Sequence, residues 1–160
     1  MRSVFVLKTI LDILFIFTIF GLLNFPILFF FEAEVVIENT EINIKTLNGK
    51  IVLGCFFVAY AIFTYVIYLF RRTAYLLLRR RIFDEKIIQN LYRIGVSLIV
   101  MAIFTKLPII FYVTISKTFY SLNITNYPFL FNIAVGLFFM IMSKVMLIAK
   151  NMKEENELTV

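Results

Sequence analysis

The chain has 160 residues, of which 62% are hydrophobic and 20 are Phe, with a mean hydropathy of +0.95 and a formal charge of +6. This composition lies outside the range of soluble domains and is typical of an integral membrane protein. One cysteine, Cys55, and no histidine exclude an intramolecular disulfide, a Cys/His zinc site, haem ligation by imidazole and a Ser-His-Asp or Cys-His catalytic pair.

Four segments are long and apolar enough to cross a hydrocarbon core about 30 Å thick, which takes roughly 20 helical residues. They run approximately over residues 9–31, 51–70, 94–115 and 129–149. The first exceeds the apolar region of a secretory signal, and no small-residue cleavage site follows it, so we expect it to be retained. The sequence thus predicts an all-α integral membrane four-helix bundle that forms one domain over residues 1–160.

Lys and Arg are distributed unevenly between the two sides of these spans. Twelve lie on the side of the two termini, namely Arg2, Lys8, Arg71, Arg72, Arg79, Arg80, Arg81, Lys86, Arg93, Lys144, Lys150 and Lys153. Three lie on the other side, Lys45, Lys50 and Lys117, while Lys106 lies within the third span. Because cytoplasmic segments carry the excess of Lys and Arg, we expect both termini in the cytoplasm of a bacterial cell membrane. The same distribution makes nucleic acid the less favoured explanation of the positive charge, and we expect no direct binding to it.

The connection between the first two spans contains EAEVVIENTEINIKTLNGK, residues 32–50. Its short runs of β-branched residues and its Asn48-Gly49 turn signal predict a small hairpin on the extracytoplasmic membrane surface. A solvated connector is the alternative.

The connection between spans two and three, residues 71–93, carries most of the basic residues. Asp84 is placed to cap a helix that starts at Glu85 and runs into span three, and Phe83 is placed to form a hydrophobic staple with Ile88. The preceding RRTAYLLLRRR predicts a continuation of span two along the interface, with arginines that reach anionic lipid. A simple positive-inside anchor explains the same residues.

Two motifs, FDEKIIQNLYRIG at residues 83–95 and KEENELTV at residues 153–160, resemble the pattern of the bacterial family catalogued as domain of unknown function 2975. Two positions depart from it, since Glu157 is longer than the usual acid and Lys86-Ile87 replaces the commoner acidic-Asn pair. The resemblance covers the whole architecture and implies a small four-span membrane protein with no assigned activity. Members are often encoded beside small helix-turn-helix regulators, which implies a soluble transcriptional regulator as a partner.

Lys106 and Pro108 interrupt the apolar stretch IFTKLPII of span three. Lys106 is twelve residues beyond Ile94, roughly 18 Å at 1.5 Å per residue, and therefore near the bilayer centre. An ionisable side chain at that depth indicates a functional site. Pro108 cannot donate a hydrogen bond to the carbonyl of Phe104, which leaves an acceptor for a cation.

Two further side chains are candidates for the same intramembrane polar site. Tyr60 of span two matches the depth of Lys106, and Asn24 of span one lies somewhat nearer the outer face. Asn24 and Lys106 each precede a proline by two residues, and broken helices of this kind surround solute sites in transporters. The alternative is a lysine that is satisfied locally or that extends to the interface.

Near the cytoplasmic face, Asp12 and Lys144 are expected to pair with each other or to reach water. A candidate cytoplasmic interaction surface combines the basic segment with the acidic tail of residues 150–160. It comprises Arg79, Arg80, Arg81, Glu154, Glu155, Glu157 and Val160. Opposite charges on one small domain attract over about a Debye length of 8 Å. We expect the tail to pack against the basic segment, or against a partner that uses it, with a solvated tail as the alternative.

Two function classes remain, and we expect neither a cofactor nor a metal in either of them. No Gly-rich phosphate loop and no paired membrane aspartates are present, so we expect no enzyme. The first class is an interaction or regulatory module of the membrane. The second is a small-solute carrier or channel component with its site at Lys106, for which homo-oligomerisation would matter because four spans enclose little volume.

Overall fold

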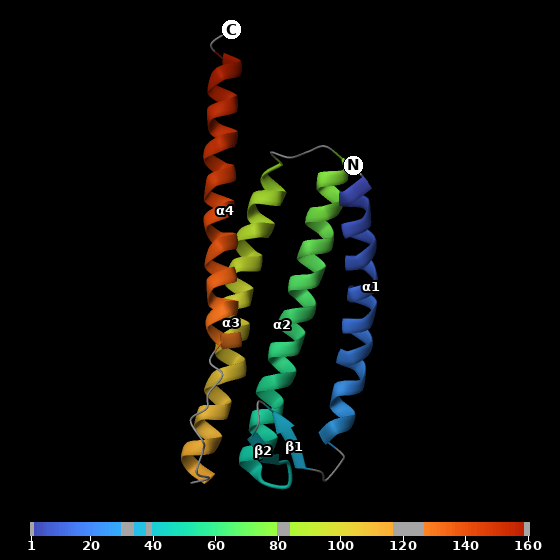
Figure 1. The fold of residues 1–160 in the computed structure, drawn as a ribbon, viewed down its shortest axis with the longest axis vertical. Helices are drawn as coiled ribbons and strands as arrows, with labels where there is room; N and C mark the ends of the chain where they lie inside the picture. Colours follow the sequence, from blue (N-terminus) through green and yellow to red (C-terminus); the bar gives the residue numbers. More distant parts are fainter. Residues whose placement is uncertain (1, 30–33, 38–39, 80–83, 117–126, 159–160) are drawn as a thin grey trace.

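Four long apolar helices make up most of the structure and lie side by side in chain order (Figure 1). The computed structural model describes residues 2–29, 34–37, 40–79, 84–116 and 127–158. The helices are α1 (Arg2–Asn24), α2 (Leu47–Leu78), α3 (Glu85–Ser116) and α4 (Tyr127–Leu158). Each is long and apolar enough to cross a membrane, which indicates a multi-pass membrane protein. The predicted all-α architecture of four packed apolar helices is confirmed.

The helices extend beyond the apolar stretches that the sequence marks. Helices α2, α3 and α4 each have 32 residues, so most of the segment expected as a connection between spans two and three is helical. Asp84 caps α3 as predicted, because its carboxylate accepts from the backbone N–H of Lys86 at 2.9 Å. The expected staple partner, Phe83, lies outside the described residues. At the first span, α1 ends at Asn24 and a 3-10 helix, η1 (Phe25–Phe29), follows it.

A two-stranded antiparallel hairpin lies between α1 and α2, at the end of the molecule opposite the two termini (Figure 1). Strand β1 (Glu34–Ile37) pairs with β2 (Thr40–Asn43), with Ile37 opposite Thr40. The predicted turn at Asn48-Gly49 is wrong. These residues form the first turn of α2, where the Thr46 side chain accepts from the Gly49 N–H at 3.1 Å, because a helix start needs an acceptor there.

The hairpin is fastened to the helices at its last residue. The backbone N–H of Asn43 donates to the Tyr112 hydroxyl of α3 at 3.0 Å. Ile42 packs in a small core with Val52 of α2 and with the Tyr112 ring. A Cβ at Gly49 would collide with the Asn43 carbonyl, so a glycine at this position allows the close approach of strand and helix.

The main core joins α2, α3 and α4. Its buried residues are Val66, Leu69, Ile94 and Leu98, with Phe70, Met101, Val135 and Phe139 packed around them. Helices α3 and α4 approach each other closely at two glycines. A Cβ on Gly95 would lie 2.5 Å from the Gly136 carbonyl oxygen, and a Cβ on Gly136 would lie 2.8 Å from the Gly95 carbonyl oxygen. Small residues at such crossings allow backbones to approach within a membrane.

Helix α1 packs mainly on α2 and is the outer helix on that side. The Tyr60 ring of α2 covers Gly21, and Phe15 of α1 lies 6.0 Å from the ring of Tyr68. Only 11% of the apolar window of α1 is buried, compared with 33% for α2. The remaining surface of α1 is therefore apolar and exposed, as expected for contact with lipid.

Replacing Gly95 by Ala should lower the thermal stability of the protein in detergent, because the added methyl group forces α3 and α4 apart. Overpacking of this kind costs roughly 1–3 kcal/mol. Gly54→Ala is the matched control, since nothing lies within 4 Å of its Cβ position and Ala favours a helix over Gly by about 1 kcal/mol. Melting curves that rank Gly95→Ala at or above Gly54→Ala would contradict the close glycine contact.

Candidate functional site

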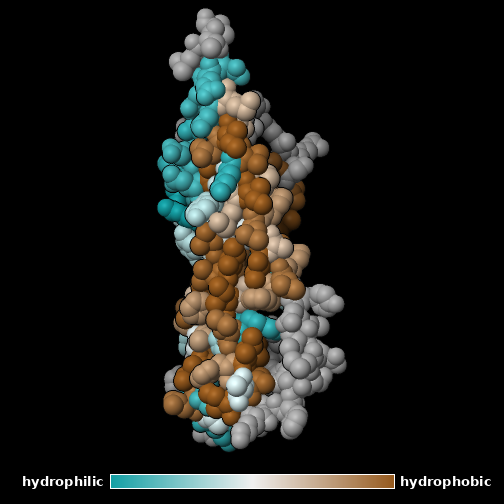
Figure 2. Space-filling view, turned by 90° about the vertical axis from the view of Figure 1, so that its left-hand side faces the viewer, coloured by the Kyte–Doolittle hydropathy of each residue, from teal (hydrophilic) through white to brown (hydrophobic). Residues whose placement is uncertain are grey.

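Charged side chains gather at the end of the molecule where α1 and α3 begin and α2 and α4 end, which we call the charged end. The cations described there are Lys8, Arg71, Arg72, Arg79, Lys86, Arg93, Lys144, Lys150 and Lys153. Figure 2 shows hydrophilic residues at this end and a largely hydrophobic surface along the middle of the molecule. The charged end is therefore a part of the described structure that can meet water and soluble partners.

An ion-pair cluster joins α1 to α2 at this end. The Asp12 carboxylate accepts a hydrogen bond from the Arg71 guanidinium, and Lys8 lies 3.8 Å from the other Asp12 oxygen. The Arg71 guanidinium also lies 5.3 Å from the centre of the Phe15 ring, a cation–π distance. Asp12 was expected to pair with Lys144 or to reach water. The pairing with Lys144 is wrong, because Lys144 is on α4, and α2 rather than α4 packs against α1.

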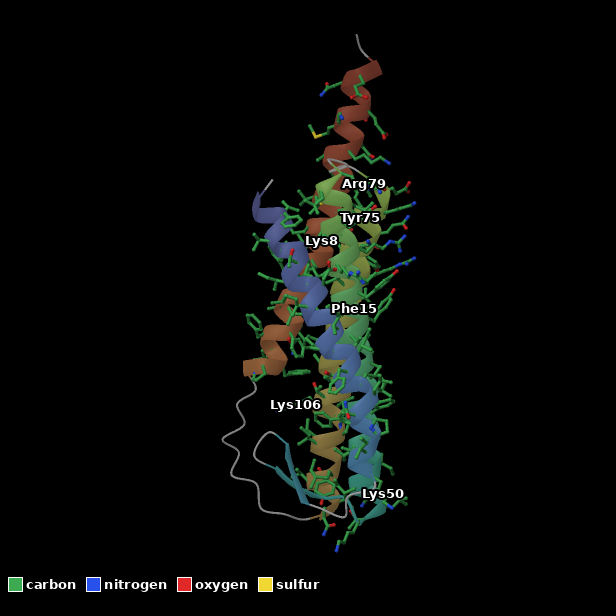
Figure 3. The ribbon with its side chains drawn as sticks, turned by 90° about the vertical axis from the view of Figure 1, so that its right-hand side faces the viewer. Lys8, Phe15, Lys50, Tyr75, Arg79 and Lys106 are labelled. Carbon is green, nitrogen blue, oxygen red and sulfur yellow. The ribbon has the colours of Figure 1, made fainter. Side chains whose placement is uncertain are left out.

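Tyr75 of α2 forms a second contact between these helices. Arg79 lies with its guanidinium 4.6 Å from the Tyr75 ring centre, and the Lys8 ammonium lies 6.0 Å from it (Figure 3). The first arginine of the predicted interaction surface is thus held over an aromatic ring. Arg80 and Arg81 lie outside the described residues.

Buried hydrogen bonds connect α2, α3 and α4 just inside the charged end. The Asn90 side-chain amide donates to the Thr73 hydroxyl at 3.3 Å, and the Ser143 hydroxyl donates to the Ile88 carbonyl at 2.8 Å. Asn90 is only 2% exposed. Buried polar groups need partners of this kind, and here the bonds fix the height of each helix against the next.

The acidic tail continues α4 as a helix rather than folding back. Glu154 pairs with Lys150 at 3.7 Å and Glu157 with Lys153 at 3.5 Å, each one turn apart on the same helix. Residues 151–157 are exposed, and α4 rises beyond the other helices (Figure 1). Glu155 is exposed on the same segment, and Val160 lies outside the described residues. Arg80 and Arg81, on which this tail was expected to pack, lie outside the described residues, so the packing stays a prediction.

The four candidate residues of the predicted intramembrane site lie on three helices, α1, α2 and α3. Lys106 is half-buried on α3, toward the hairpin (Figure 3), and α3 continues through Pro108 to Ser116. Asn24 is exposed on α1 and its amide donates to the carbonyl of Phe20 in its own helix at 2.8 Å. Tyr60 turns toward α1, where its ring stacks on Phe25 at 6.1 Å. The hydrogen bond of Asn24 is therefore made within α1, and the ring contact of Tyr60 is made with η1.

The two prolines act differently, although the sequence pattern around them is the same. Pro26 lies in η1, immediately after α1 ends, so the backbone changes its helix type there. Pro108 lies inside a continuous α3. A proline that neighbouring helices accommodate in this way is common in membrane helices.

Comparison with known proteins gives a family and no function. A family model described as "Protein of unknown function (DUF2975)" matches residues 3–160, nearly the whole chain. No curated protein and no solved structure shows significant similarity to the chain. The match confirms the resemblance that the motifs at residues 83–95 and 153–160 indicated.

A double-mutant cycle should show that Asp12 and Arg71 interact. We expect Asp12→Asn and Arg71→Gln together to destabilise the protein less than the sum of the two single changes, because either change already breaks the pair. The side chains are 31% and 43% exposed, so the coupling should be at most about 1 kcal/mol. Thermal unfolding in detergent measures it.

The matched control combines Asp12→Asn with Lys144→Gln, which should be additive because α1 packs on α2 and not on α4. Additive effects for Asp12 with Arg71, or coupling of Asp12 with Lys144, would contradict the ion pair.

Proposed function

The chain belongs to the DUF2975 family of proteins of unknown function, and we propose that it is a non-enzymatic interaction or regulatory module of a bacterial cytoplasmic membrane. It has four candidate membrane spans. In this proposal the charged end is the interaction surface, and its partner is a small soluble transcriptional regulator of the helix-turn-helix class, as the family resemblance implies.

The orientation that this function requires has the charged end in the cytoplasm. Support comes from the described cations, nearly all of which lie at that end, while Lys45 and Lys50 lie at the end with the hairpin. Membrane proteins keep the excess of Lys and Arg on the cytoplasmic side. Both termini are then cytoplasmic and the hairpin is extracytoplasmic.

The helices are long enough to extend beyond a membrane, which supports a cytoplasmic surface formed by helices and not only by loops. A helix of 32 residues is about 48 Å long, which exceeds a hydrocarbon core of about 30 Å by roughly 18 Å. Apart from Lys50 near the start of α2, the charged residues of α2 begin at Arg71, and those at the start of α3 extend from Glu85 to Arg93, which supports placing the excess length at the charged end. Parts of α2, α3 and α4 project there as rigid helices.

The single observation that carries the proposal is the end of α4. Residues 151–157 are helical and exposed, and the segment extends past the rest of the molecule (Figure 1). Its two ion pairs, each between residues one turn apart, stabilise a helix by about 0.2–0.5 kcal/mol each and so help the segment to stay helical. An ordered helix of mixed charge with an exposed Met152 presents both charge and apolar area to a protein partner.

The carrier alternative has less support. A solute site at Lys106 needs polar groups from neighbouring helices, and the two candidates from α1 and α2, Asn24 and Tyr60, are engaged elsewhere.

Reporter fusions test the orientation. Fusions at residues 85 and 160 should report the cytoplasm, and fusions at residues 40 and 122 should report the opposite side. The physical reason is the uneven distribution of Lys and Arg. A signal from outside the cytoplasm at residue 85 would overturn the topology and the cytoplasmic partner with it.

Deleting residues 151–160 should greatly reduce the recovery of the helix-turn-helix partner when the tagged chain is purified from native membranes in mild detergent. The melting temperature should change little, because residues 151–157 are exposed. Mass spectrometry of the copurified proteins gives the readout.

The control for this deletion is the double variant Lys45→Gln with Lys50→Gln, which removes charges at the opposite end of the molecule. Recovery of the regulator should match the unmodified chain. Equal recovery by the truncated and full-length chains would refute the role of the tail, and the absence of any such regulator from both would refute this choice of partner.

A further inference from the structure

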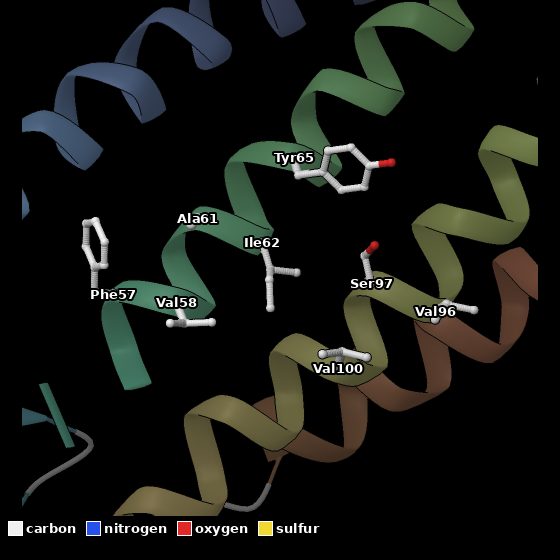
Figure 4. Close-up of a pocket in the computed structure, with 8 residues that line it drawn as sticks. All are labelled: Phe57, Val58, Ala61, Ile62, Tyr65, Val96, Ser97 and Val100. Atoms are coloured by element: carbon white, nitrogen blue, oxygen red, sulfur yellow. The ribbon is translucent and has the colours of Figure 1, made fainter. Parts of the chain in front are cut away.

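An open groove of about 420 Å³ runs between α2 and α3 on one face of the molecule (Figure 4). Its lining includes Phe57, Ala61 and Tyr65 of α2 and Val96, Ser97 and Val100 of α3. The lining is almost entirely apolar, and Figure 4 shows the Tyr65 and Ser97 hydroxyls at the same end of the groove, with apolar side chains along the rest. Its volume falls in the range of roughly 300–1,000 Å³ that small-molecule sites occupy.

Arginines continue both walls of this groove toward the charged end. Arg72 follows Tyr65 by seven residues, or two helical turns, and Arg93 precedes Ser97 by four. Residues at these spacings lie on one face of a helix. Both arginines are exposed, so a molecule in the surrounding membrane can reach their guanidinium groups.

The two arginines also lie at nearly the same height. The hydrogen bond from Asn90 to Thr73 sets the register of α3 against α2, which places residue 91 level with Arg72. Arg93 is then two residues, about 3 Å, nearer the groove. Figure 3 shows nitrogen-tipped side chains along one side of α2 and α3 at the charged end. The guanidinium groups of Arg72 and Arg93 therefore lie beyond the end of the apolar groove that is nearer the charged end.

We propose that this face binds one anionic phospholipid from the membrane leaflet at the charged end, with its phosphate between Arg72 and Arg93 and one acyl chain in the groove. Guanidinium groups match phosphate oxygens in geometry and charge. Tyr65 has the apolar body and polar tip that suit the boundary between headgroup and acyl chain. The proposal goes beyond the interaction module, because it concerns the α2–α3 face and not the end of α4.

The chemistry of the groove and its arginines favours this occupant over three others. A water-soluble anion would not use the apolar groove, and a zwitterionic lipid would bring its own cation close to both arginines. A second copy docked symmetrically on the same face would place its own Arg72 and Arg93 at the same depth, so like charges would oppose each other. The anionic phospholipid satisfies the cations and the apolar lining together.

The test uses the purified full-length chain in neutral detergent, with phosphatidylglycerol or phosphatidylcholine added in matched amounts and bound lipid counted by native mass spectrometry. We expect one phosphatidylglycerol to be retained in preference to phosphatidylcholine. Arg72→Gln with Arg93→Gln should weaken its binding on the order of tenfold or more, because each interfacial cation contributes to anionic-lipid affinity.

Two controls separate a built site from general attraction. Lys144→Gln with Lys153→Gln removes the same charge from α4 and should leave phosphatidylglycerol binding within about twofold of the unmodified chain, well below the tenfold effect. Ala61→Phe fills the groove and should reduce binding, whereas Val145→Phe adds the same ring to an α4 position that is 52% exposed and should not.

Equal losses of phosphatidylglycerol binding in the Arg72/Arg93 variant and the Lys144/Lys153 variant would overturn the proposal in favour of diffuse charge attraction. Equal retention of phosphatidylglycerol and phosphatidylcholine would overturn it in favour of simple solvation by lipid. A dimer that Ala61→Phe dissociates without loss of lipid would overturn it in favour of a second copy. Because the two arginine changes, Ala61→Phe and Val145→Phe leave residues 151–157 of α4 unchanged, failure of the lipid proposal leaves the regulator proposal standing, and failure of the regulator proposal leaves the lipid proposal standing.

Discussion

In the hydrocarbon core of a membrane, each backbone N–H and C=O must find its hydrogen-bond partner within the protein, since no water is available. In this chain, that constraint produces four long helices, and it also restricts how the helices hold each other. Apolar contact alone drives association weakly in lipid, so close approach and hydrogen bonds matter more. The close approach is that of Gly95 to Gly136. The hydrogen bonds are those from Asn90 to Thr73 and from Ser143 to the Ile88 carbonyl. Together they make α2, α3 and α4 a unit with a fixed register, and the alignment of Arg72 with Arg93 depends on that register.

The parts of the fold that local chemistry determines were predictable from sequence. Apolar stretches of about 20 residues identify the four helices, because the bilayer thickness sets their minimum length. Asp84 identifies the start of α3, because a carboxylate before a helical pattern satisfies a free backbone N–H. Family membership was also readable from two short motifs, and Gly95, which ends the first of them, has a physical reason in its contact with α4.

The parts that depend on which helices are neighbours were not predictable. Sequence reasoning matched Asp12 with Lys144 and Tyr60 with Lys106 by depth in the membrane, yet depth says neither which helices touch nor which side of a helix a residue occupies. Since α1 packs on α2, Asp12 meets Arg71 and Tyr60 covers Gly21. The Asn48-Gly49 pair, a frequent hairpin turn, starts a helix here because Thr46 caps it. The groove between α2 and α3 left only a faint signal, a spacing of seven between Tyr65 and Arg72.

The position of Lys8, one helical turn before Asp12, bears on how the chain is made. Domains emerge from the ribosome in order from the N-terminus, so α1 exists before α2 has been synthesised. During that interval Arg71, which lies 59 residues later, cannot neutralise Asp12. Lys8 can, because residues one turn apart on a helix are neighbours as soon as the helix forms. The acidic side chain at the edge of the first span therefore has a counter-ion from the time α1 forms, and it gains Arg71 as a second one when α2 packs against α1.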